Sequence, residues 1–240
     1  MINHKQKLLS LYVHWPYCES KCPYCDFNSH VNETINVNDW IKSYKNQLLA
    51  MKEELIENNI NFKHLDTIFF GGGTPSLMPL KIIECILDTS EEIFGFNKDI
   101  EVTLETNPSS YENKKFTNYK QIGINRLSIG AQSLNNKYLK FLGRSHDIED
   151  VKVALNDASE IFENISADLI YAFHGQRIHD WIRELESFLN TYDLQHLSLY
   201  QLTIEEGTKF FKDYKKGIIK VIDDDKAAEF YDISDSILSD

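Results

Sequence analysis

The stretch from Leu11 to His30, LYVHWPYCESKCPYCDFNSH, holds the strongest structural signal in the chain. Three of the four cysteines, Cys18, Cys22 and Cys25, fall in it with the spacing C-x3-C-x2-C, directly after a short apolar run. Thiolates on one loop can converge on a single metal or cluster. Iron–sulfur clusters usually take four cysteine ligands, and structural zinc usually takes four ligands. Three cysteines therefore favour a catalytic metal centre that keeps one coordination position free.

Two other interpretations start from the same residues. A structural zinc loop would need His14 or His30 as its fourth ligand. Cys85 could also complete the set, but it stands among apolar residues at helical spacing in KIIECILDTSEEIF, where a small core residue is the simpler interpretation. Disulfides are disfavoured because three cysteines so close together cannot pair evenly.

The length and composition limit the classes of protein to which the chain can belong. The chain has 240 residues, of which 42% are hydrophobic, and a formal net charge of -12. This length suits one domain, or one domain and part of another, and the acidic balance argues against nucleic acid as the main partner. No apolar run is long enough to span a bilayer, and Ser10, His14 and Pro16 interrupt any signal peptide. We expect a cytoplasmic protein, in which clustered thiols serve as metal ligands or redox groups.

Outward from the cysteine loop, short apolar strands alternate with helical patterns. Strands are predicted at 8–13, 65–70, 100–105, 126–130, 166–171 and 196–202, and helices at 37–57, 79–94, 135–142, 148–161 and 178–191, with a further helical stretch ending at Gly123. This order predicts an α/β fold of parallel βα units, either a doubly wound sheet or an incomplete TIM-like barrel. In both, functional groups lie at the C-terminal ends of the strands.

Polar groups follow that rule here. The cysteines come after the first strand, Gly71 to Gly73 after the second, and Glu105 ends the third. Gln132 follows the fourth strand, and Asp168 lies in the fifth. We expect these groups to meet on one rim. Residues 209–240 lie outside the βα repeat, so we assign a core domain to 1–208 and a C-terminal extension to 209–240.

The cysteine motif after YVHWP, with GGGTP ending the second strand, resembles the radical S-adenosylmethionine (SAM) superfamily. The resemblance implies a partial (βα)6 barrel and a [4Fe–4S] cluster held by Cys18, Cys22 and Cys25. It also implies that SAM occupies the open iron through its amino and carboxylate groups. Electron transfer from the cluster would then cleave SAM and release a 5′-deoxyadenosyl radical.

Several segments narrow the resemblance to the branch that contains oxygen-independent coproporphyrinogen III oxidase, namely YCESKCPYCDFNSH, FFGGGTPSL, LETNP, NRLSIGAQSLNNKYLKFLGRSHD, ADLIYAFHGQ and HLSLYQLTIEEGT. Phe27 stands where the oxidase has an additional cysteine, and few residues precede Leu8, so the chain is more similar to HemW-type heme chaperones. This implies heme as ligand, a heme-accepting apo-protein such as a membrane-associated respiratory cytochrome, and an electron donor such as flavodoxin or ferredoxin. Whether the protein is an enzyme stays open: a coproporphyrinogen oxidase and a zinc-stabilised binding module are the alternatives.

The resemblance also assigns residue roles. Tyr12, Gly72 and Glu105 would contact the cluster-bound SAM. Five further residues match positions for a second SAM in the oxidase: Gly73, Thr74, Gln132, Arg144 and Asp168. The simpler interpretations are strand-end or capping carboxylates for Glu105 and Asp168, a surface ion pair for Arg144, and a loop-backbone contact for Gln132.

Two departures from the family pattern matter. Phe173 and His174 replace the Leu-Pro that usually follows the fifth strand, and His174 is either a heme ligand or a solvent-facing loop histidine. Members of the branch continue into a C-terminal domain, whereas this chain ends at Asp240. We therefore expect that domain to be missing and the barrel to be open on one side.

Overall fold

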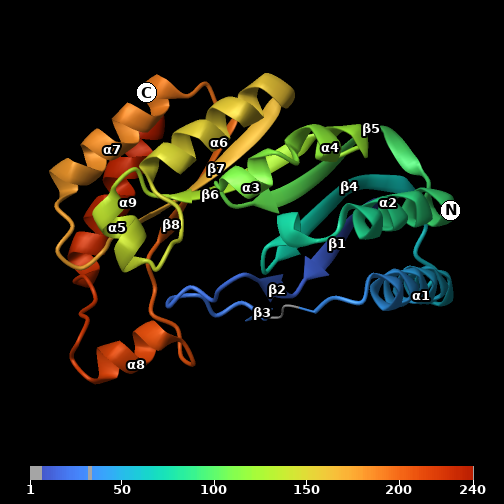
Figure 1. Cartoon of the computed structure of the whole chain (residues 1–240), viewed down its shortest axis with the longest axis horizontal. Helices are drawn as coiled ribbons and strands as arrows, with labels where there is room; N and C mark the ends of the chain where they lie inside the picture. The colour runs from blue at the N-terminus through green and yellow to red at the C-terminus, as the bar shows by residue number, and fades with distance from the viewer. Residues whose placement is uncertain (1–6, 32–33, 240) are drawn as a thin grey trace, which may run out of the picture.

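The computed structural model describes residues 7–31 and 34–239 and contains a six-stranded, fully parallel sheet (Figure 1). The strands are β1 (Lys7–Trp15), β4 (Phe62–Gly72), β5 (Phe96–Thr106), β6 (Arg126–Gln132), β7 (Asn164–Tyr171) and β8 (His196–Gln201). Their spatial order, β1-β4-β5-β6-β7-β8, is their order along the chain. In a doubly wound sheet, the order of the strands would reverse partway across the sheet. The predicted α/β partial barrel is therefore confirmed, and the doubly wound alternative is wrong.

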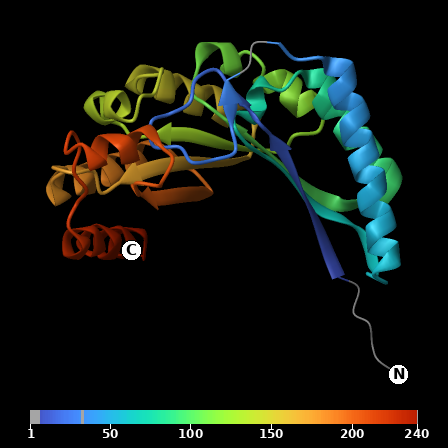
Figure 2. The ribbon, with the colours of Figure 1, turned by 90° about the horizontal axis from the view of Figure 1, so that it is seen from below.

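Helices connect the strands, as the alternation predicted. They are α1 (Val37–Glu57), α2 (Leu80–Phe94), α3 (Ser110–Asn113), α4 (Phe116–Gln121), α5 (Asn136–Phe141), α6 (Ile148–Ile161) and α7 (Ile178–Thr191). The sheet curls as it passes from β1 to β8, so one of its faces is concave (Figure 2). None of the helices in the described ranges is long and apolar enough to cross a membrane.

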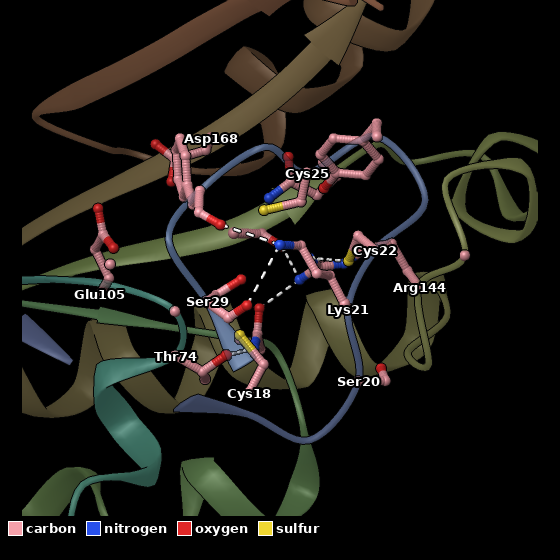
Figure 3. A pocket seen from close by; sticks show the side chains of 18 of the residues that line it. Cys18, Ser20, Lys21, Cys22, Cys25, Ser29, Thr74, Glu105, Arg144 and Asp168 are labelled. Carbon is pink, nitrogen blue, oxygen red and sulfur yellow. Dashed lines mark hydrogen bonds between the residues drawn. The ribbon is translucent and has the colours of Figure 1, made fainter. Parts of the chain in front are cut away.

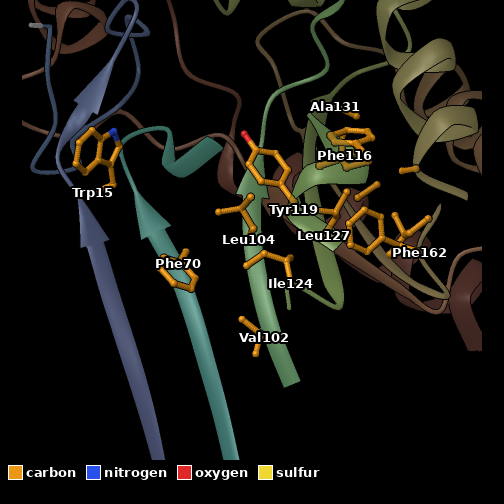
Figure 4. Close-up of a cluster of buried hydrophobic side chains, with 14 of the residues drawn as sticks. Trp15, Phe70, Val102, Leu104, Phe116, Tyr119, Ile124, Leu127, Ala131 and Phe162 are labelled. Carbon is orange, nitrogen blue, oxygen red and sulfur yellow. The ribbon is translucent and has the colours of Figure 1, made fainter. Parts of the chain in front are cut away.

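The two faces of the sheet carry different residues because side chains alternate along each strand. The convex face is apolar: Phe70, Leu104 and Leu127 are fully buried there and pack with helix residues such as Phe116 (Figure 4). Burying such side chains supplies the main favourable term in folding. The neighbouring positions face the concave side and are mostly polar. This side of the half-barrel is therefore suited to bind a ligand and not to pack against helices.

Three short elements complete the structure. β2 (Tyr17–Cys18) and β3 (His30–Val31) form a small parallel ladder, and η1 (Pro75–Leu77) follows the glycine loop. The ladder pairs Tyr17 with His30 and so joins the two ends of the cysteine loop. This loop is thereby fixed at its base, beside the C-terminal ends of β1 and β4.

The C-terminal segment forms α8 (Lys209–Lys215) and α9 (Asp224–Ser239). The Phe210 backbone N–H donates to the Pro23 carbonyl of the cysteine loop at 2.8 Å. Trp181 of α7 donates to Ser234 of α9, also at 2.8 Å. Both helices thus pack on the barrel, and the domain boundary at 208 stays a prediction.

Candidate functional site

A cavity of about 330 Å³ opens at the C-terminal ends of the strands (Figure 3). It brings together ten of the eleven residues to which the resemblance assigns a cluster or SAM role: Cys18, Cys22, Cys25, Gly72, Gly73, Thr74, Glu105, Gln132, Arg144 and Asp168. Apart from Arg144, which follows α5, these residues lie on or directly after five strands that are far apart in the sequence. Their convergence is what a parallel barrel produces, and it makes this cavity the candidate site.

The cysteine loop is shaped by its own backbone carbonyls. Lys21 donates from Nζ to the carbonyls of Phe27 at 3.1 Å and Ser29 at 3.3 Å (Figure 3). Pro23 lies against Gly143, where a side-chain Cβ would come within 2.7 Å of the proline ring. Gly143 also has φ +66°, so a larger residue would be strained there as well as crowded. The loop is thus held from within and by the turn after α5.

The donor chemistry of the loop fits an iron–sulfur cluster. Cys18, Cys22 and Cys25 are all free thiols on one cavity wall. Burial raises the pKa of Cys25, and the Cys22 and Cys18 thiols raise it further. Across residues 7–31 and 34–239, no group of three His, Cys, Asp or Glu side chains is gathered closely enough to hold a metal ion.

The alternative fourth ligands lie elsewhere. His14 Nε2 is 3.0 Å from the Asn28 carbonyl, and His30 Nε2 is 3.2 Å from the Asn28 side-chain oxygen. Cys85 lies on α2 with its sulfur 3.9 Å from Thr89 Oγ1. None of the three lines the cavity. The cavity lining therefore contains the three thiols and none of the proposed fourth zinc ligands.

The glycine loop lies against the backbone that leads into the cysteine loop. Gly73 N–H donates to the Trp15 carbonyl at 2.7 Å, and Thr74 N–H donates to the Tyr17 carbonyl at 2.9 Å. A Cβ at Gly73 would come within 2.7 Å of that same Tyr17 carbonyl oxygen. Glycine is required here because only a residue without a side chain permits this approach.

Two carboxylic acids, Glu105 on β5 and Asp168 on β7, face the cavity. Burial, and then the charge of Asp168, raise the pKa of Glu105 to about 7, against a smaller lowering by the Gly72 N–H. Burial also raises the pKa of Asp168, although Ser198 and Ser128 lower it by hydrogen bonding. A cationic ligand group would relieve both shifts, since a nearby positive charge favours the ionised acid.

Arg144 lies at the cysteine loop. Its Nη1 is 3.5 Å from Cys22 Sγ, and its Nη2 donates to the Gly130 carbonyl at 3.3 Å and to the Asn107 side-chain oxygen. The simpler interpretation of Arg144, a surface ion pair, is wrong. Asn107 in turn donates to Thr74 Oγ1 at 3.4 Å, so it joins the arginine to the glycine loop.

Two further residues that line the cavity, Asn107 and Glu112, were missed in the sequence. Asn107 follows Glu105 in LETNP, and its place just beyond a strand end was a usable signal. Glu112 of α3 is buried and accepts hydrogen bonds from Thr106 Oγ1 at 2.8 Å, Asn107 N–H at 2.9 Å and Ser76 Oγ. Its place three residues after the N-cap Ser109 was a local signal, but its contact with Ser76 was not predictable, because only the fold brings this helix to the glycine loop.

Gln132 occupies a strained position at the cavity edge. Its φ of 66° is unusual for a residue with a side chain. The following turn is anchored by Glu184 of α7, which accepts from Ser133 Oγ and Leu134 N–H, each at 2.5 Å. Because Glu184 fixes the next two residues, the turn can hold Gln132 in this conformation toward the cavity.

Tyr12 and His174 lie outside the lining of the cavity. Tyr12 is 56% exposed on the concave face and stacks on Phe69, with ring centroids 6.2 Å apart. His174 is exposed, and its Nδ1 donates to the Val221 carbonyl at 3.2 Å. A contact between Tyr12 and SAM stays a prediction, as does either interpretation of His174.

Comparison with known proteins identifies the family to which the chain belongs. The sequence profile described as "Radical SAM superfamily" matches residues 12–188. The chain belongs to the radical SAM superfamily. Membership implies SAM and a [4Fe–4S] cluster as cofactors; the cysteine loop supplies three thiols of the right chemistry, but within the described residues they are not gathered into a metal-binding group.

Individual relatives narrow the comparison. The chain is 36% identical over 232 residues to mouse "Radical S-adenosyl methionine domain-containing protein 1, mitochondrial", covering 96% of this chain and 51% of the relative. It is 38% identical over 204 residues to "Heme chaperone HemW" of Haemophilus influenzae, covering 84% of this chain and 53% of the relative. The chain therefore spans about half the length of the curated relatives it matches. Escherichia coli coproporphyrinogen III oxidase (HemN) shares the fold with a TM-score of 0.80 at 24% identity, over 98% of this chain and 53% of that chain.

Proposed function

We propose that this protein is a HemW-type heme chaperone, which binds heme and a SAM-coordinated [4Fe–4S] cluster and hands the heme to an acceptor apo-protein. The observation that carries the proposal is the convergence on one cavity of three free thiols, the glycine loop and the two carboxylic acids. Similarity to a protein named heme chaperone, and Phe27 in place of the oxidase's additional cysteine, support the chaperone over the oxidase.

Within this proposal Cys18, Cys22 and Cys25 ligate the cluster, which when bound supplies an electron-transfer centre with one iron open to SAM. Gly72 and Gly73 let the backbone approach the cofactor. Glu105, once ionised, attracts its cationic groups. The remaining cavity residues shape the wall around it, and a second SAM at Gly73, Thr74, Gln132, Arg144 and Asp168 belongs to the proposal as well.

Arg144 also has a second role, at the cysteine loop. Its guanidinium is directed at Cys22 and Asn107, so it stabilises negative charge on the cysteine loop. A soluble electron donor of the flavodoxin or ferredoxin type, an acceptor such as a respiratory cytochrome, and a cytoplasmic location complete the proposed function.

An anaerobically reconstituted sample tests the proposal. Iron and sulfide near four each per chain are expected for a [4Fe–4S] cluster, together with saturable hemin binding and no turnover of coproporphyrinogen III. SAM-dependent decarboxylation of that substrate would replace the chaperone with the oxidase. Stoichiometric zinc without iron would instead establish the zinc-stabilised module. Transfer of bound hemin to an apo-cytochrome, followed by its absorption spectrum, is the direct test of the chaperone step.

A further inference from the structure

One row of side chains on the concave face lies outside the lining of the cavity. The strand register aligns Tyr12 of β1 with Phe69 of β4, Phe69 with Thr103 of β5, and Thr103 with Arg126 of β6. We refer to these four residues as the floor row. It lies two residues below Glu105, toward the N-terminal ends of the strands. None of the four lines the cavity, and Thr103 is fully buried, but the Glu105 charge raises the pKa of Tyr12, so the floor row adjoins the cavity from below.

Arg126 is the charged member of the floor row, and it is half-buried. Its Nη1 donates to Thr103 Oγ1 at 3.2 Å, and this hydroxyl donates in turn to Glu101 Oε1 at 3.1 Å. Within the described part of the chain no carboxylate lies within 4.0 Å of the guanidinium, whereas Arg177 and Arg183 both pair with Asp180. A half-buried guanidinium with most of its donors unused is suited to bind a carboxylate.

The aromatic members of the floor row supply a second, independent feature. Tyr12 and Phe69 stack with an interplanar angle of 17° and ring centroids 6.2 Å apart, and neither belongs to the apolar core on the convex face. Tyr12 is 56% exposed, and Tyr200 of β8, which also faces the concave side, is 54% exposed. Large aromatic side chains exposed on a concave surface are typical of sites for flat apolar ligands.

Charge fixes the orientation of such a ligand. Above the floor row, Glu105 and Asp168 repel anionic groups and suit the cationic groups of a cofactor. Below them, the Arg126 and His196 charges act on Asp168 in the opposite sense and lower its pKa. An acidic, planar ligand would therefore place its carboxylates toward Arg126 and its ring against Tyr12 and Phe69.

We infer that the floor row is the binding site for a carboxylate-bearing tetrapyrrole, with Arg126 holding a propionate and the Tyr12–Phe69 pair supporting the ring. The inference rests on the proposed function for the identity of the ligand. Its own content is the location of the ligand on the concave face, beneath the cavity that serves SAM and the cluster. Tyr12 keeps its predicted contact with SAM, and its ring would also support the tetrapyrrole from the side of β1.

The test is an anaerobic titration of the cluster-loaded protein with two probes, hemin and coproporphyrin III, each as the free acid and as the methyl ester. The Arg126→Gln protein should bind the free acids about 10- to 100-fold more weakly than the wild type, because it has lost a charge-assisted hydrogen bond. Binding of the esters should be unchanged, because they offer no carboxylate. Arg126→Lys should recover part of the affinity, since it keeps the charge but loses the planar fork.

Arg183→Gln is the matched control, because it removes an arginine from the outer helix α7 and should leave every affinity at the wild-type value. Cluster content and melting temperature are measured for each variant. A general structural effect of Arg126 would lower acid and ester binding alike, and that result overturns the inference, as does wild-type acid binding by Arg126→Gln.

The same titration separates the two proposals. If hemin binding is independent of Arg126, the result supports the chaperone function and excludes the floor row as the binding site. If coproporphyrin III binds in an Arg126-dependent way and hemin does not bind at all, the result supports the site and excludes the chaperone function.

Discussion

The two faces of the sheet differ although they are built from the same strands. On β4, Phe70 is fully buried under helices, whereas its neighbour Phe69 is half-buried on the concave face. On β6, Leu127 belongs to the core, whereas Ser128 lines the cavity. The convex face has apolar partners for each side chain. The concave face instead carries two carboxylic acids and Arg126, which forms no ion pair within residues 7–31 and 34–239, so we assign stability to the first face and ligand binding to the second.

The largest expected effect compares two cysteines. Cys22→Ala should abolish the cluster, because it removes one of three thiolates and leaves the iron without a replacement ligand. Cys85→Ala is the matched control: this thiol lies on α2, which covers the convex face, and its loss should leave the iron content unchanged. Iron and sulfide analysis with the visible absorption spectrum measures both. A Cys22→Ala protein that keeps a full cluster would remove the ligand assignment.

The second comparison uses adjacent phenylalanines on β4. Phe70→Ala should lower the free energy of unfolding by about 3–5 kcal/mol, because it opens a cavity in a filled core. Phe69→Ala should cost about 1 kcal/mol or less, because its ring is already partly in water. Denaturant titration of both variants measures the difference. Equal losses would mean that the concave face is also a packed core.

The third comparison uses two asparagines at opposite ends of β5. Asn107→Ala removes the link between Arg144 and Thr74 and should weaken SAM binding about tenfold, because hydrogen bonds to charged groups are worth about 1.5–3 kcal/mol. Asn97 is also half-buried, and its amide donates to Asp66 at 2.8 Å, but it lies at the opposite end of the strand. Asn97→Ala should therefore leave SAM affinity unchanged. Calorimetry on the cluster-loaded variants decides, and equal affinities for wild type and Asn107→Ala would contradict the link.

The concave rim was largely predictable because parallel strands place their C-terminal ends together. The positions of Glu105, Gln132 and Asp168 relative to apolar strands were enough to predict that they meet. The position of Tyr12 could not be predicted in this way. Tyr12 lies one row below the cavity because of the register between β1 and β4, which no local sequence pattern reveals. Glu184 was also beyond reach, since it lies on a helix and reaches the site only through tertiary packing, and the same holds for the contact of Glu112 with Ser76.

The smallest expected effect is a dependence of stability on pH. Burial and the Asp168 charge raise the pKa of Glu105 to about 7, above its ordinary value of 4.5. The folded protein therefore binds a proton that the unfolded chain releases between these values, and stability should fall as the pH rises from 4.5 through 7. We expect a decrease on the order of 1 kcal/mol, because the carboxyl group is partly in water. Glu105→Gln should remove most of this slope in denaturant titrations across the pH range.

Asp168→Asn sharpens the same measurement. Without the neighbouring charge the pKa of Glu105 should fall, so that the loss of stability begins and ends at lower pH. Saturating SAM should act in the same direction, since its cationic groups favour ionised Glu105. An unchanged slope in Asp168→Asn would show that burial alone sets the Glu105 pKa, and that the two acids of the concave face do not form one cation-binding pair.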